Sequence, residues 1–79
     1  MKISYDPTYN IAYIHLREKG TDIETIRITD EMNIDLSPDG KVYGIELLNA
    51  NEQLDIMEQL KFTFINEKNN TQIDLPVSV

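Results

Sequence analysis

The chain has 79 residues and contains no cysteine, no tryptophan, and only three glycines and three prolines. The absence of cysteine excludes a disulfide framework and a thiolate metal site, and it favours a reducing compartment, so we expect a cytoplasmic protein. No apolar run approaches the ~20 residues of a membrane-spanning helix. The residues after Met1 and Lys2 also lack the apolar core of a signal peptide. We therefore expect no membrane partner.

Basic residues are scarce. Seven lysines and arginines face fourteen aspartates and glutamates, which gives a formal net charge of -7. Proteins that bind nucleic acids present clustered Lys and Arg to the phosphates, and here the cations are scattered along the chain. We therefore expect no direct nucleic-acid binding, whereas an acidic surface suits a basic protein partner.

Apolar residues are frequent enough for one small core, and eleven of them are isoleucines. A domain of this length buries a small share of its surface, so a second copy or a partner is a natural supplement to its stability. Alternation with period two predicts five strands. They cover residues 2–6, 10–17, 23–29, 32–37 and 42–48. Ile23 breaks the alternation of the third, which indicates a late start or a bulge.

The turn at Ser37-Pro38-Asp39-Gly40 is the strongest in the chain, and Gly40 is expected to take a positive φ there. The strand that follows is the most apolar, which places it in the centre of the sheet. Gly44 inside this strand indicates a bulge or a close approach by another element.

One helix is expected after this strand. Asn49 and Glu52 have the spacing of a capping box, and Leu54, Met57 and Leu60 have helical spacing for a stripe that packs on the sheet. The next residues, 62–65, either prolong the helix or form a strand. From Ile73 to Val79 apolar and polar residues alternate, with Pro76 favouring a sheet edge. The sequence thus predicts a single α+β domain over residues 1–60 and a C-terminal extension over 61–79, an edge strand or hairpin.

A calcium-loop pattern is present around the strong turn. Asp35, Ser37, Asp39, Gly40 and Glu46 occupy positions 1, 3, 5, 6 and 12 of that pattern. The flanks alternate with period two, whereas an EF-hand requires flanking helices, so a plain hairpin turn explains the pattern better. Pairing across the turn is expected to place Glu46 near Glu31 and away from Asp35. Asp35, Asp39 and Glu46 are kept as the metal candidates, and no cofactor is expected.

The sequence supports a catalytic site less than it supports a calcium site. The single histidine, His15, excludes a His-based metal triad within one chain and is at most a lone general base. No serine has the spacing of a nucleophile motif with a paired histidine and aspartate. We therefore expect no enzymatic activity.

Several motifs together resemble a known family. They are Tyr5-Asp6-Pro7, Ala12-Tyr13-Ile14-His15-Leu16, Asn33-Ile34-Asp35-Leu36, Asp39-Gly40-Lys41-Val42, and Gly44-Ile45-Glu46 followed by Asn49-Ala50. Residues 1 to 51 are similar, in register, to the small bacterial family catalogued as domain of unknown function 2283. The resemblance implies a small α+β protein with an antiparallel sheet. It also implies an antitoxin-like role, since members are sometimes encoded beside small toxins. His15 departs from the family's usual arginine, and residues 61–79 have no family pattern.

Two functional hypotheses follow. The first is a non-enzymatic protein-binding module, in its narrowest form antitoxin-like. The alternative is a small metal-binding or enzymatic protein that acts through the Asp35–Glu46 turn region. The fold expected for either is α+β: an antiparallel β-meander of about five strands with one helix packed on one face. A chain this small, with an alternating tail, is expected to form a homodimer through the tail or an edge strand.

Overall fold

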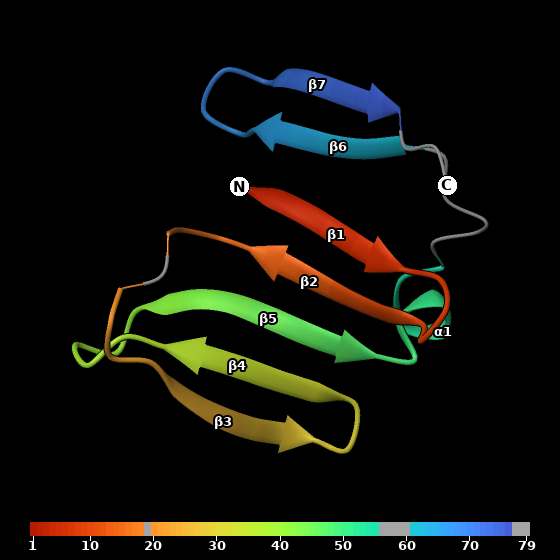
Figure 1. The fold of residues 1–79 in the computed structure, drawn as a ribbon. Coiled ribbons are helices and arrows are strands. Elements are labelled where there is room, and N and C mark those ends of the chain that lie inside the picture. Colours follow the sequence, from red (N-terminus) through yellow and green to blue (C-terminus); the bar gives the residue numbers. More distant parts are fainter. Residues whose placement is uncertain (19, 56–60, 77–79) are drawn as a thin grey trace.

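The computed structural model of the chain describes residues 1–18, 20–55 and 61–76. The elements follow one another from the N-terminus as in Figure 1. They are β1 (Lys2–Asp6), β2 (Ile11–His15), β3 (Glu24–Thr29), β4 (Met32–Leu36), β5 (Val42–Leu48), α1 (Ala50–Leu54), β6 (Lys61–Asn66) and β7 (Thr71–Pro76). Within these residues no helix is long and apolar enough to cross a membrane.

The first five strands form one antiparallel sheet, with the strand order β1-β2-β5-β4-β3. The α+β class and the five strands are confirmed. A simple meander is wrong, because the chain crosses from β2 to the far edge and returns through β3 and β4 (Figure 1). The crossing leaves the central position to β5, the most apolar strand, whose two edges are then both paired.

One face of this sheet carries a line of five isoleucines, one from each strand. Residues directly opposite each other on paired strands point to the same face. The register pairs these isoleucines successively from one edge of the sheet to the other: Ile3, Ile14, Ile45, Ile34 and Ile26. We call this line the isoleucine row. A parallel line on the same face contains Tyr5, Ala12, Leu47 and Met32.

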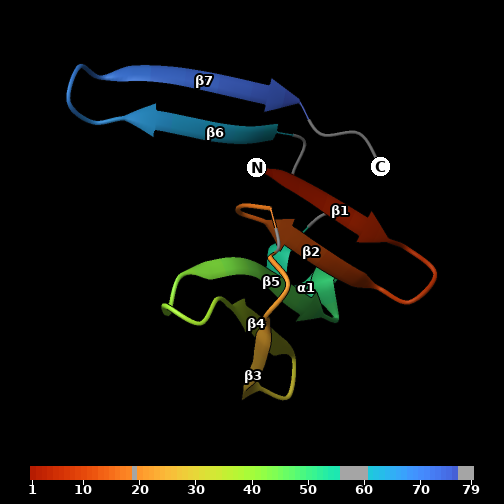
Figure 2. The same cartoon turned by 60° about the vertical axis from the view of Figure 1, so that its left-hand side comes forward.

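Helix α1 covers the second line and leaves the isoleucine row half open. Ala12, Leu47 and Ala50 form the buried cluster, and Leu54 packs against it. Both views place α1 beside the N-terminal end of β2 and the C-terminal end of β5 (Figures 1 and 2). In the isoleucine row, by contrast, Ile3 is 50% exposed and Ile26 37% exposed, and the other three are half-buried. The core is therefore small and lies at one end of the face.

The start of α1 is held by a residue from a distant turn. Asn49 precedes the helix as expected, but it has a φ of 52° and its side chain caps no backbone N–H; its amide instead donates to Glu52 at 2.7 Å. Asn10 supplies the cap: its Oδ1 accepts the Asn51 N–H at 2.8 Å, and its carbonyl accepts the Ala50 N–H at 2.9 Å. The predicted capping box is wrong because this tertiary contact replaces it. Met57 and Leu60 lie outside the described residues.

Two irregularities in strand pairing determine which side chains lie on each face of the sheet. Leu36 lies opposite Val42 but Asp35 lies opposite Gly44, so Tyr43 is the extra residue of a bulge in β5. Its carbonyl accepts N–H bonds from Leu16 and Arg17 at the end of β2. The third strand both starts after Ile23 and changes register between Arg27 and Thr29, as its broken alternation indicated. Gly40 has a φ of 85°, as predicted.

The C-terminal extension has strand character, which is confirmed. Residues 62–65 belong to β6 and do not prolong the helix; β6 pairs with β7 as a separate two-stranded antiparallel sheet. We call it the C-terminal hairpin. Figures 1 and 2 both show it beyond β1, at the edge of the five-stranded sheet.

Replacing Asn10 tests whether it holds the helix. Asn10→Gly keeps the left-handed backbone, since the φ of Asn10 is 56°, and removes only the side-chain bonds. We expect a loss of ~1–2 kcal/mol in the free energy of unfolding, measured by urea denaturation, because the hydrogen bonds of the side chain to Tyr5, Asn49 and Asn51 are lost. The matched control is Asn70→Gly, at a φ of 55° in the turn of the C-terminal hairpin. Equal effects of the two substitutions would contradict the role given to Asn10.

Candidate functional site

The face of the sheet opposite the isoleucine row is polar. Its residues come from positions that alternate with the isoleucines along each strand, so the register places them in two neighbouring lines. The first line contains Lys2, His15, Gly44, Asp35 and Thr25, and the second contains Ser4, Tyr13, Glu46, Asn33 and Arg27. We call this surface the polar face.

Asp35 is the most buried charged residue of this face, with 9% of its surface exposed. Two hydroxyl groups donate to its carboxylate: Tyr13 Oη to Oδ2 at 2.5 Å, and Thr25 Oγ1 to Oδ1 at 2.6 Å. Charge-assisted hydrogen bonds of this kind are short and strong, and they offset part of the cost of burying a carboxylate. The bonds connect β2 with β4 and β3 across the intervening strand β5.

Gly44 allows Tyr13 to reach Asp35. A Cβ at position 44 would lie 2.4 Å from the Tyr13 hydroxyl and 2.5 Å from its ring carbons, distances that no real side chain permits. The ring therefore lies across the bare backbone of β5. Both readings of Gly44 are confirmed, because the close approach occurs next to the bulge at Tyr43.

His15 lies beside this group and close to a serine. Its Nε2 is 3.3 Å from Ser4 Oγ, and its ring centroid is 4.4 Å from that of Tyr13. Sequence spacing did not identify the Ser4–His15 pair, because the pair arises only from the register of β1 on β2. Nucleophilic catalysis needs an activated hydroxyl together with donors for a developing oxyanion. Ser4 lies on an exposed edge strand, which does not enclose a substrate.

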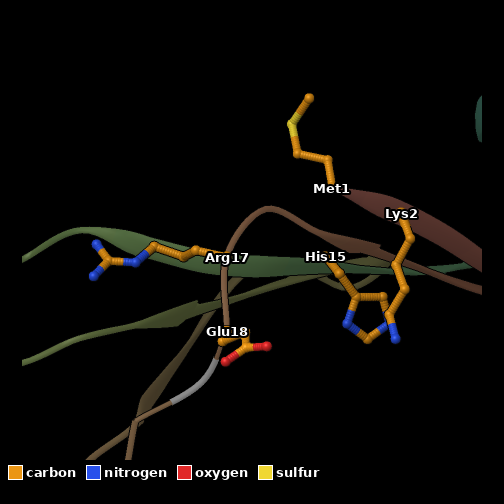
Figure 3. Close-up of a pocket in the computed structure, with 5 residues that line it drawn as sticks. All are labelled: Met1, Lys2, His15, Arg17 and Glu18. Carbon is orange, nitrogen blue, oxygen red and sulfur yellow. The ribbon is translucent and has the colours of Figure 1, made fainter.

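A pocket of about 610 Å³ lies next to His15 and is lined by Met1, Lys2, His15, Arg17 and Glu18. Figure 3 shows Lys2 beside the His15 ring, whereas Arg17 extends away from both. The Arg17 guanidinium lies 5.3 Å from the centroid of the Tyr43 ring, a cation–π contact that directs it away from Lys2 and His15. The cationic side chains therefore do not converge on one point.

The candidate metal residues are engaged separately. Asp35 accepts from Tyr13 and Thr25, Asp39 accepts from the Ser37 hydroxyl, and Glu46 accepts from Asn33 Nδ2 at 2.9 Å. Among the described residues no three His, Asp or Glu side chains come together to hold a metal ion. Glu46 lies opposite Asn33, which is two positions from Glu31 and two from Asp35, so the register places Glu46 no nearer to Glu31 than to Asp35.

The turn between β4 and β5 is held by Ser37. Its backbone N–H donates to the Lys41 carbonyl at 2.9 Å, and its hydroxyl oxygen accepts the Lys41 N–H at 3.1 Å. The same hydroxyl donates to Asp39, and this bond is the main reason why the pKa of Asp39 lies below its ordinary value. Coulombic attraction to Arg17 lowers the pKa further. The oxygen atoms of this turn thus accept hydrogen bonds that hold the hairpin closed.

Substitutions at Gly44 test the close approach of Tyr13. Gly44→Ala should lower the free energy of unfolding by ~1–3 kcal/mol, because the methyl group displaces the ring. In a Tyr13→Ala background the same change should be neutral or slightly stabilising, since alanine suits a strand better than glycine. The measurement is a double-mutant cycle by urea denaturation. An equal cost in both backgrounds would refute the argument.

Removing the Ser37 hydroxyl should raise the pKa of Asp39 toward its ordinary value. A carboxylate with a lowered pKa stabilises the folded state above the ordinary pKa and loses this effect as the pH falls through the folded value. The stability difference between the wild type and Ser37→Ala should therefore shrink in acid. NMR titration of the Asp39 side chain gives the pKa directly, with Ser4→Ala as the distant control. An unchanged Asp39 pKa in Ser37→Ala would show that another group causes the shift.

Comparison with known proteins places this sheet in a family. A family model described as "Protein of unknown function (DUF2283)" matches residues 2–51. No curated protein and no solved structure matches the chain significantly. The matched residues contain all five strands of the larger sheet and the first residues of α1, and they end before the C-terminal hairpin. Because the match extends over more than half of the chain, the protein belongs to the DUF2283 family.

Proposed function

We propose that this chain is a non-enzymatic protein-binding module that binds its partner through the isoleucine row. The observation that carries the proposal is the row itself: five isoleucines cross the whole sheet, and none of them is fully buried. Contiguous apolar surface that stays open in a folded protein marks interaction sites. Covering it is favourable by roughly 25 cal/mol for each Å² removed from water.

Charge supports a protein partner. The chain carries a net charge of -7, and the exposed Glu24 lies two residues before Ile26 on the same face of β3. An apolar centre with an acidic rim complements a partner with an apolar patch and a basic rim. An antitoxin-like role, in which the module covers the surface of a small basic toxin, is the narrowest form of this proposal.

The enzymatic or metal-binding alternative has less support. It would act through the Asp35–Glu46 region, where the three candidate carboxylates accept hydrogen bonds from different protein groups. The Ser4–His15 pair offers a nucleophile and a base but lies on an exposed edge. Calcium titration by calorimetry, with Asp39→Ala as the control, distinguishes this alternative from a binding module. We place the module in the cytoplasm, on the ground that the chain has no cysteine.

Two neighbouring residues of β1 provide a matched test. Ile3 belongs to the isoleucine row and Ser4 to the polar face, both are exposed, and substitution by glutamate adds one negative charge at either. We expect Ile3→Glu to reduce partner binding about tenfold or more, because a charge would be buried in an apolar contact. Ser4→Glu should bind like the wild type.

The measurement is affinity capture from native lysate with each tagged full-length variant, quantified by mass spectrometry for proteins that the wild type enriches. Circular dichroism verifies that both variants are folded. If Ile3→Glu and Ser4→Glu retain the same proteins in the same amounts, binding does not use the isoleucine row.

A further inference from the structure

The C-terminal hairpin has one apolar face and one face that carries polar residues together with Ile65. Its register places Phe62 opposite Leu75 and Phe64 opposite Ile73, so these four side chains share a face. On the other face Thr63 donates to Asp74 at 2.8 Å, and the Lys61 ammonium lies 3.9 Å from the same carboxylate. On this face of the hairpin the Asp74 carboxylate is thus paired within the hairpin. Each of the four apolar side chains on the other face is 47–57% exposed.

A hairpin with an exposed apolar face is expected to pack against another surface. A two-stranded hairpin is marginally stable at best in water, and a hydrophobic face becomes useful only when it packs on another surface. The hairpin forms a sheet separate from the five-stranded one and lies beyond β1 in both views (Figures 1 and 2). The chain therefore presents two apolar surfaces, the hairpin face and the isoleucine row.

The dimensions of the whole chain indicate that it buries less surface than a compact monomer does. Its radius of gyration is 14.2 Å, whereas a compact chain of this length has about 11.6 Å. Its accessible surface is 6209 Å², about 1,300 Å² more than the ~4,900 Å² of a folded monomer of this mass. A specific interface of ordinary size buries about 800 Å² on each partner. The excess surface is thus large enough for such an interface.

The isoleucine row and the hairpin as a whole have similar lengths. The isoleucine row crosses five strands, and four spacings of ~4.8 Å make it about 19 Å long. Each strand of the hairpin has six residues and is about 20 Å long at ~3.3 Å per residue. A hairpin laid at right angles to the strands of the sheet would therefore extend along the whole row, and its four apolar side chains, two residues apart on each strand, would cover about 7 Å of it. Orthogonal packing of this kind is one of the two usual arrangements of stacked sheets.

We infer that the partner on the isoleucine row is a second copy of this chain, whose C-terminal hairpin lies across the row. The inference rests on the proposed function, and it replaces the basic foreign partner considered there with a second copy of the chain. Each chain offers one row and one hairpin, so two copies related by a two-fold axis cover both surfaces of both chains and leave none for a third. The four apolar residues of the hairpin then complete the small core around Ala12 and Leu47.

Charge gives this dimer a distinctive salt dependence. Two copies, each with a net charge of -7, repel one another, and the apolar contact has to overcome this repulsion. Salt screens charges over about 8 Å at physiological ionic strength. Added salt should therefore strengthen association between two copies, whereas it would weaken binding to a basic foreign protein. The sign of the salt effect separates the second copy from such a partner.

Cysteine pairs test the contact, because the natural chain has no thiol of its own. Full-length Ile34→Cys and Phe64→Cys proteins are mixed and oxidised gently. We expect a covalent heterodimer of about twice the chain mass, in at least about tenfold greater yield than from the control mixtures. The controls replace one partner by Arg27→Cys, on the polar face of the sheet, or by Thr63→Cys, on the polar face of the hairpin.

Light scattering on the untagged wild type gives the mass in solution. A dimer at micromolar concentration, more stable at higher salt and lost in Phe64→Glu and in Ile3→Glu but not in Ser4→Glu, supports the inference. A wild type that is monomeric at high micromolar concentration overturns it, as does a dimer whose crosslinking yield equals that of the controls. If the protein is monomeric and Ile3→Glu still loses a captured protein, the proposed function stands and only the second copy is wrong. If the monomeric Ile3→Glu variant captures the same proteins in the same amounts as the wild type, the proposed function and the inference are both wrong.

Discussion

The register of β5 between β2 and β4 determines which side chains share each face of the sheet. Because side chains alternate along a strand, a shift of one residue would move every one of them to the opposite face. The bulge at Tyr43 makes this shift once, after the turn, and thereby places Ile45 and Leu47 beside Ile34 and Met32. It also places Gly44 on the polar face, where Tyr13 needs the space. One extra residue thus determines both surfaces of the protein.

The polar face and the helix depend on contacts between distant segments. Asp35 binds hydroxyl groups from β2 and β3, and Asn10 holds the start of α1, forty-one residues further along the chain at Asn51. A five-residue helix cannot form by itself in water, so this tether and the packing of Ala50 on Ala12 account for its presence. The buried polar group at Asp35 serves the same purpose for the strands, because it is satisfied only when all three are in register.

The apolar surfaces explain why a chain with an ordinary share of hydrophobic residues has so small a core. Only Ala12, Tyr43, Leu47 and Ala50 are buried apolar residues among those described. The five isoleucines of the row are only partly buried or exposed, and the hairpin exposes Phe62, Phe64, Ile65 and Ile73. A protein of this size lies close to the limit at which one core supports a fold, and in the proposed dimer burial against the second copy would supply the missing area. Binding and stability are then two results of the same contact.

Local pattern determined the elements, and tertiary structure determined their neighbours. Period-two alternation was sufficient for all five strands, and the turn at Gly40 followed from its residues, because strand geometry and glycine's access to positive φ are local properties. The segment 62–65 fitted a helix or a strand equally, and only pairing with β7 decided it. The same holds for the Ser4–His15 pair, the hydroxyl donors to Asp35 and the cap at Asn10. Each joins residues that are far apart in sequence, and the order β1-β2-β5-β4-β3, which brings them together, depends on the burial of β5 rather than on the order of strands along the chain.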